Sequence, residues 1–179
     1  MSLKRDRGSF RSDNCRMPDK STALRHAAWA DEKLFHSLST LPIRALAATY
    51  GPPEWTVAHM ARHIVDGAEW FRYCLSGVSW SELRLPEDVA DLQSLSGHLA
   101  SVNAALIEQA GLPEELVSFT DETGPKHVYR SVILAQAALH ATEHRAQIAC
   151  ALEVSGFAGL SLDAIDVWSF ASSESRDGR

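Results

Sequence analysis

Two histidines, His140 and His144, interrupt the apolar seam of a long helix that the sequence predicts in its last third. Residues four positions apart lie on one helix face, with their Cβ atoms about 5–6 Å apart. The seam consists of Ile133, Ala137, His140, His144, Ile148 and Ala151. Both imidazoles are therefore expected to face the core, where they either share a metal ion or are satisfied by hydrogen bonds.

A third histidine, His63, is the best candidate to complete a metal site. It lies with Trp70 along the edge of an apolar stripe at helical spacing, formed by Met60, Ile64, Gly67, Phe71 and Leu75. One helix that supplies a single histidine and another that supplies two can fill three corners of a tetrahedron, which leaves the fourth for water or substrate. His59, one turn earlier on nearly the same face, ranks second for this role.

Length and charge narrow the class of protein. The chain has 179 residues, which fits one domain, and its formal net charge is −6. Since no basic stripe with interleaved aromatic residues is present, nucleic-acid binding is not expected. A membrane span needs about 18 consecutive apolar residues, and the sequence has no such run.

The cysteines indicate a reducing compartment. Cys15, Cys74 and Cys150 are odd in number and widely spaced, so they form neither a disulfide framework nor a zinc ribbon. Cys74 and Cys150 have apolar neighbours on predicted helices, which is more typical of buried structural thiols than of a catalytic cysteine. We therefore expect a cytoplasmic protein.

Four amphipathic helices are predicted between the two ends of the chain. They run from Ser21 to Leu41, from Trp55 to Gly77, from Pro86 to Gly111 and from Val128 to Glu153. Such helices predict an all-α four-helix bundle, a fold that builds metal sites from inward side chains. Residues 18–170 are expected to form this domain, with a disordered basic leader over 1–17 and a disordered tail over 171–179.

The connections carry weaker signals. The linker between the third and fourth helices is expected to be a longer crossover, with a short extended excursion or hairpin around Thr123-Gly124-Pro125 but not a sheet. The segment from Leu160 to Phe170 is expected to form a short helix that packs Ile165 and Trp168 on the bundle.

Four local patterns resemble the DinB-like metal-binding four-helix bundles over most of residues 20–170. They are Arg25-His26-Ala27-Ala28-Trp29-Ala30-Asp31-Glu32, Trp55-Thr56-Val57 with a histidine eight residues after the tryptophan, His140-x-x-x-His144-Arg145-x-Gln147, and Asp166-x-Trp168. The family includes damage-inducible proteins and low-molecular-weight-thiol transferases such as mycothiol-dependent maleylpyruvate isomerase. Carried over by position, its metal ligands fall on His63, His140 and His144. The sequence departs from the family at Glu143, where many members have a histidine, and at Ala146, where glycine is usual.

The resemblance implies a metal-dependent thiol S-transferase that acts on small electrophiles, with nickel or zinc as the metal. The metal would bind a thiol or water as the reactive anion. Asp66, Glu143 and Gln147 are candidates to orient the ligand imidazoles, although solvated or packing roles suit them as well. The resemblance, together with the surplus tryptophans Trp29, Trp70, Trp80 and Trp168, also implies a homodimer.

Other functional classes remain open at this stage. A metal-dependent hydrolase is one, and a metal-binding stress-related module without turnover is another. His140-Ala141-Thr142-Glu143-His144 also fits the pattern of inverted zinc proteases, but such enzymes need a larger scaffold and a downstream acidic ligand, and the acidic residues that follow lie in a terminal segment.

Overall fold

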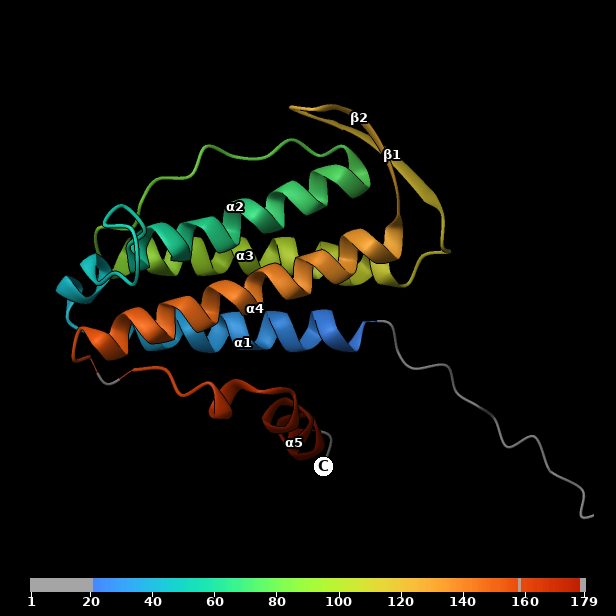
Figure 1. Ribbon diagram of the computed structural model, residues 1–179. Coiled ribbons are helices and arrows are strands. Elements are labelled where there is room, and N and C mark those ends of the chain that lie inside the picture. Colours follow the sequence, from blue (N-terminus) through green and yellow to red (C-terminus); the bar gives the residue numbers. More distant parts are fainter. Residues whose placement is uncertain (1–20, 158, 178–179) are drawn as a thin grey trace, which may run out of the picture.

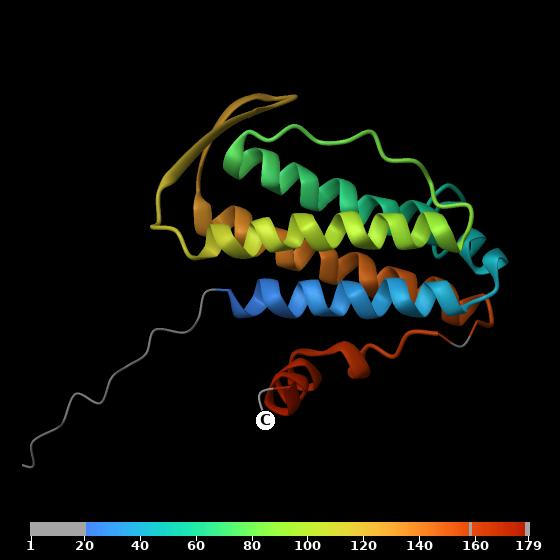
Figure 2. The ribbon, with the colours of Figure 1, turned by 180° about the vertical axis from the view of Figure 1, so that it is seen from behind.

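The computed structural model describes residues 21–157 and 159–177, and its body is a bundle of four long helices (Figure 1). The helices are α1 (Thr22–Thr40), α2 (Val57–Ser76), α3 (Val89–Ala110) and α4 (Arg130–Val154). Helices α1 and α2 each pack against both α3 and α4, so α1 and α2 lie on opposite corners. Figure 2 shows α1 and α3 side by side from behind. The predicted four-helix bundle is confirmed.

Local chemistry sets the helix boundaries close to the predicted positions. The Thr56 hydroxyl accepts a hydrogen bond from the backbone N–H of His59, and the Asp88 carboxylate accepts one from Asp91, so both side chains act as N-caps. Helix α2 ends at Gly77, which has a φ of 70° and donates its N–H to the carbonyl of Tyr73. This left-handed position favours glycine.

The core lies between the four helices and is mostly apolar, with a few buried polar side chains such as Asp31, Glu69 and His144. Its largest fully buried side chains include Phe35 of α1, Met60 and Ile64 of α2, Leu99 of α3 and Ile148 of α4. Burial of such side chains stabilises the fold by roughly 1.5–3 kcal/mol each. The same face of α4 that carries Ile148 also carries His144, so this histidine lies next to the apolar core.

The crossover along the bundle was predicted between α3 and α4, but it lies between α2 and α3 (Figure 1). Residues 77–88, between α2 and α3, run back along the bundle, so α2 and α3 point in the same direction (Figure 1). The connection between α3 and α4 instead stays at one end of the bundle. It contains a hairpin around the predicted turn, in which β1 (Leu116–Asp121) pairs antiparallel with β2 (Gly124–Tyr129).

The hairpin alternative is confirmed, and in the described residues its two strands form no larger sheet. The hairpin forms here because partly buried and exposed residues alternate along both strands. Val117, Phe119 and Val128 are partly buried against the bundle, while their strand neighbours are exposed. Such a pattern stabilises a short hairpin that could not persist alone. Gly124, at a φ of 114°, allows the tight turn.

The carboxyl-terminal segment also corrects two expectations. It forms a short 3-10 turn, η2 (Asp163–Ile165), and helix α5 (Val167–Asp177). Ile165 is buried as predicted, but Trp168 is 79% exposed and Phe170 is buried instead, because residues two apart lie on opposite sides of a helix. Residues 171–177, expected as a disordered tail, are helical and are held by the ion pair between Arg25 and Glu174. The leader predicted over residues 1–17 lies outside the described residues.

A second short 3-10 helix, η1 (Ile43–Ala47), joins α1 to the loop before α2. None of the helices in the described part of the chain is both long and apolar enough to cross a membrane.

Candidate metal centre

Three histidines from α2 and α4 converge on one point. The Nε2 atom of His140 lies 3.2 Å from Nε2 of His63 and 3.1 Å from Nε2 of His144. Two nitrogens that each lie about 2.0–2.1 Å from a tetrahedral ion are about 3.3 Å apart. The spacing of the imidazoles therefore fits a shared metal ion, and the cluster could hold one.

The side chain of Gln147 fixes the tautomer of His144. The Trp55 indole N–H, which can only donate, lies 3.1 Å from Oε1 of Gln147, so this atom of the amide is the oxygen. The same oxygen lies 2.8 Å from Nδ1 of His144, and Nδ1 must therefore carry a proton. In the neutral ring this leaves the lone pair on Nε2, where the other two histidines converge.

Hydrogen bonds among the three histidines cannot provide a partner for every Nε2 atom. Nε2 of His144 is an acceptor, and a single proton on Nε2 of His140 can point at only one of its two neighbours. A metal ion, by contrast, accepts lone pairs from all three nitrogens. The geometry thus favours a metal site over the alternative of hydrogen-bonded buried histidines.

The electrostatic surroundings keep the imidazoles of His140 and His63 neutral. Burial, together with the neighbouring His144 and His63, lowers the pKa of His140 to about 4. Burial also lowers the pKa of His63, with His144 and Arg62 acting in the same sense. Neutral imidazole is the form that binds metal, so both rings are available for binding at neutral pH.

Gly67 allows the close approach of α2 and the His140 ring. A Cβ atom at this position would lie 2.3 Å from Cε1 and 2.7 Å from Nδ1 of His140. Any side chain at residue 67 would therefore displace the imidazole. The sequence placed Gly67 only on the apolar stripe of its helix, and the reason for glycine becomes visible only when α2 and α4 are brought together.

The remaining predicted residues lie in different surroundings. His59, ranked second as a ligand, is outside the cluster, and its Nδ1 lies 3.2 Å from the Thr56 hydroxyl. Asp66 forms an ion pair of 3.2 Å with Arg62, and burial raises its pKa while Arg62 opposes that rise. Glu143 is exposed on α4. Of the three candidates for orienting a ligand, Gln147 is the one that contacts an imidazole of the cluster.

An open pocket of about 480 Å³ adjoins the cluster. His63 and His140 both line it, together with Asp66, Trp70, Phe71 and Trp80. His144 lies behind them and is buried. A small molecule in this pocket would therefore meet the side of the cluster formed by His63 and His140.

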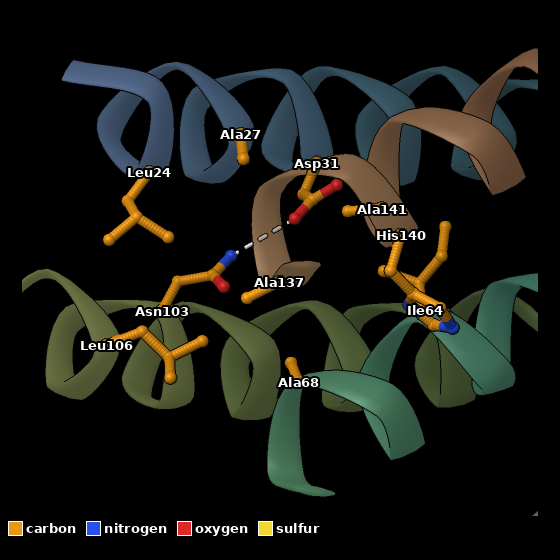
Figure 3. A pocket seen from close by; sticks show the side chains of 10 residues that line it. All are labelled: Leu24, Ala27, Asp31, Ile64, Ala68, Asn103, Leu106, Ala137, His140 and Ala141. Carbon is orange, nitrogen blue, oxygen red and sulfur yellow. Dashed lines mark hydrogen bonds between the residues drawn. The ribbon is translucent and has the colours of Figure 1, made fainter. Parts of the chain in front are cut away.

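A buried polar network lies across a small cavity from His140. Figure 3 shows Asp31 of α1, Asn103 of α3 and His140 of α4 around a small cavity of about 10 Å³, roughly the size of one water molecule. Asn103 Nδ2 donates to Asp31 at 3.1 Å, and Arg145 Nη1 donates to the same carboxylate at 2.5 Å. In the sequence, Asp31 and Arg145 stood out only as members of two patterns that resemble the DinB family. The spacing of residues along the chain did not indicate that these two side chains pair or that Asn103 joins them.

The comparison with known families agrees with this architecture. The profile of the DinB family matches residues 17–175, which covers all four bundle helices and the three clustered histidines. No curated protein matches the sequence significantly. Because the match spans nearly the whole chain and the helices and histidine cluster are those that the family resemblance implied, this chain belongs to the DinB family.

Proposed function

We propose that His63, His140 and His144 hold a nickel or zinc ion, and that the protein is a thiol S-transferase that acts on small electrophiles. The observation that carries the proposal is the convergence of three Nε2 atoms whose accessible side opens into a pocket. Three protein ligands with an open position are typical of catalytic rather than structural metal sites.

The metal, when bound, would lower the pKa of a thiol so that the nucleophilic thiolate exists at neutral pH. The protein's own residues would then bind and orient. His63 and His140 face the reacting molecules, while Gln147 and Trp55 hold the ring of His144 in the tautomer that leaves its Nε2 free.

The reaction balances without a redox partner. The thiol gives its proton to solvent, and its sulfur forms a bond to an electrophilic carbon. The electron pair displaced from that carbon leaves with a departing group, or it moves to a neighbouring atom that takes up a proton. No oxidant or reductant is required.

Other nucleophiles in the described residues are less suitable. Burial raises the pKa of Cys74 to about 11, so its thiolate is disfavoured at neutral pH. Ser118 and His127 form a hydrogen bond of 2.8 Å, but they lie on the exposed face of the hairpin, on the side away from the bundle. The histidine cluster is therefore the better-supported reactive centre.

Cobalt substitution tests the proposal. Addition of mycothiol, bacillithiol or glutathione to the cobalt-loaded protein should produce a thiolate absorption band for at least one thiol, because thiolate binding to cobalt changes its spectrum. The His140→Ala variant should lose this response. If the spectrum ignores all three thiols while a test ester or amide is hydrolysed, the protein is a metal-dependent hydrolase and the transferase proposal is wrong.

A further inference from the structure

The pocket beside the histidine cluster has an aromatic wall. Trp70 and Phe71 come from α2, and Trp80 comes from the linker 77–88 that runs back along the bundle. The Trp80 ring meets Trp70 edge to face with centroids 5.7 Å apart, and it meets Tyr73 at 5.0 Å. Trp80 nevertheless remains 55% exposed, so much of its surface is available to a ligand.

A buried carboxylate fixes the linker that carries Trp80. Glu69 of α2 is fully buried, at 0% exposure, and accepts a hydrogen bond of 3.0 Å from the backbone N–H of Ser81. It also accepts bonds from the His98 ring of α3 at 2.8 Å and from Arg72 at 3.3 Å. A buried carboxylate needs such donors, and here one of them is the residue that follows Trp80. Glu69 is therefore a positioning residue for the aromatic wall.

The charges of the pocket lining are already paired. Asp66 forms an ion pair with Arg62, and Glu69 forms one with Arg72. Among the described residues, the lining contains no lysine or arginine. An anionic group held against the aromatic wall, away from a metal ion on the histidines, would thus lose its hydration without gaining a cationic side chain, which costs free energy.

We propose that this pocket takes an uncharged aromatic molecule, which lies against Trp80 and Trp70 with its reactive carbon toward His63 and His140. The inference rests on the proposed function and names the substrate class of the same site. Aromatic rings bind each other through large apolar contact area and through offset or edge-to-face geometry. A saturated ring of similar size would keep the apolar area but lose the aromatic contribution.

Three ring compounds test this proposal on the zinc-loaded full-length protein. They are naphthylmethanol, its saturated counterpart decahydronaphthylmethanol, and naphthalenesulfonate, with binding followed by NMR titration. Naphthylmethanol should bind about tenfold more tightly than either of the others. Equal affinity for the saturated alcohol would overturn the aromatic preference, and equal or tighter binding of the sulfonate would overturn the preference for an uncharged ligand.

Variants locate the binding site. Trp80→Ala should weaken naphthylmethanol binding about tenfold, whereas Trp168→Ala, on exposed α5, should leave it unchanged. Glu69→Gln should weaken it in part while zinc content stays the same, since Glu69 acts on the linker and not on the cluster. Unchanged binding in the Trp80 variant would refute the proposal.

Different results would contradict the metal-dependent function and the aromatic substrate class. If the protein binds zinc and responds to a thiol but shows no preference among the ring compounds, only the substrate class is wrong. If it binds no zinc, the proposed function is wrong. Naphthylmethanol binding that Trp80→Ala does not weaken would place the ligand at a different surface and contradict the inference.

Discussion

Replacement of Asp31 by alanine should lower the free energy of unfolding by about 3–5 kcal/mol, the largest stability effect that we expect from a single substitution in this chain. Asp31 and Arg145 are each 2% exposed, and the guanidinium of Arg145 donates to the carboxylate at 2.5 Å. Removal of the carboxylate would leave a buried positive charge whose remaining acceptors in the described part of the chain are the Thr142 hydroxyl and a distant carbonyl of Ala27. Denaturant unfolding of the purified variant measures the change.

Two controls separate charge from packing. The double variant Asp31→Leu, Arg145→Met should recover much of the lost stability, because replacing both members of a buried pair by apolar residues is often nearly neutral. Glu32→Ala, at the neighbouring exposed position of α1, should change stability by less than about 0.5 kcal/mol. A loss below about 1 kcal/mol in Asp31→Ala would show that the pair does not hold α1 to α4 as described.

Substitution of Gly67 by alanine should weaken zinc or nickel binding by about 10–100-fold while the protein remains folded. Alanine favours a helix over glycine by roughly 1 kcal/mol, so helix propensity alone predicts a more stable protein. The new Cβ atom would, however, lie 2.3 Å from Cε1 of His140, and the imidazole must move away from its two partners. Calorimetric titration of the metal-free protein with zinc measures the affinity.

Gly97 provides the matched control. It lies in the interior of α3, and a Cβ atom there would meet nothing within 4 Å. Gly97→Ala should therefore raise stability by up to about 1 kcal/mol and leave metal affinity unchanged. Metal binding by Gly67→Ala that equals the affinity of the natural protein would contradict the close approach of α2 to His140.

Much of the fold could be predicted because the four helices carry strong local signals. Gly77 marks the end of α2, and the recurrence of Leu92, Leu95 and Leu99 marks the buried face of α3. What the sequence could not supply is the path between helices. The direction of the linker 77–88 depends on contacts with the bundle, and these contacts join residues that are distant in sequence. The turn residues around Gly124, by contrast, already indicated the hairpin.

The candidate site divides in the same way. His140 and His144 could be placed on one face from their spacing alone, and His63 followed from the apolar stripe of α2. The choice between His63 and His59 was resolved by the structure, because it depends on how far α2 is shifted along α4. Trp168 was misplaced because the start of α5 determines which of Trp168 and Phe170 faces the core, and element boundaries are the least reliable part of sequence-based prediction.

The roles of Trp55, Gly67, Asn103 and Glu69 could not be predicted for a related reason. Each acts on a residue of another helix or loop: Trp55 on Gln147, Gly67 on His140, Asn103 on Asp31, and Glu69 on Ser81. No local pattern distinguishes such residues from ordinary packing or solvated ones. Knowing which residues distant in sequence contact one another would have been needed to predict these roles.

Elemental analysis of the zinc- or nickel-reconstituted protein after dialysis tests the central claim most directly. We expect close to one tightly bound ion per chain, since the three Nε2 atoms form one cluster. His63→Ala, His140→Ala and His144→Ala should each lose most of it, whereas His59→Ala and the exposed His36→Ala should keep it. Full metal content in the His63, His140 and His144 variants, or no bound metal in the natural protein, would contradict the account.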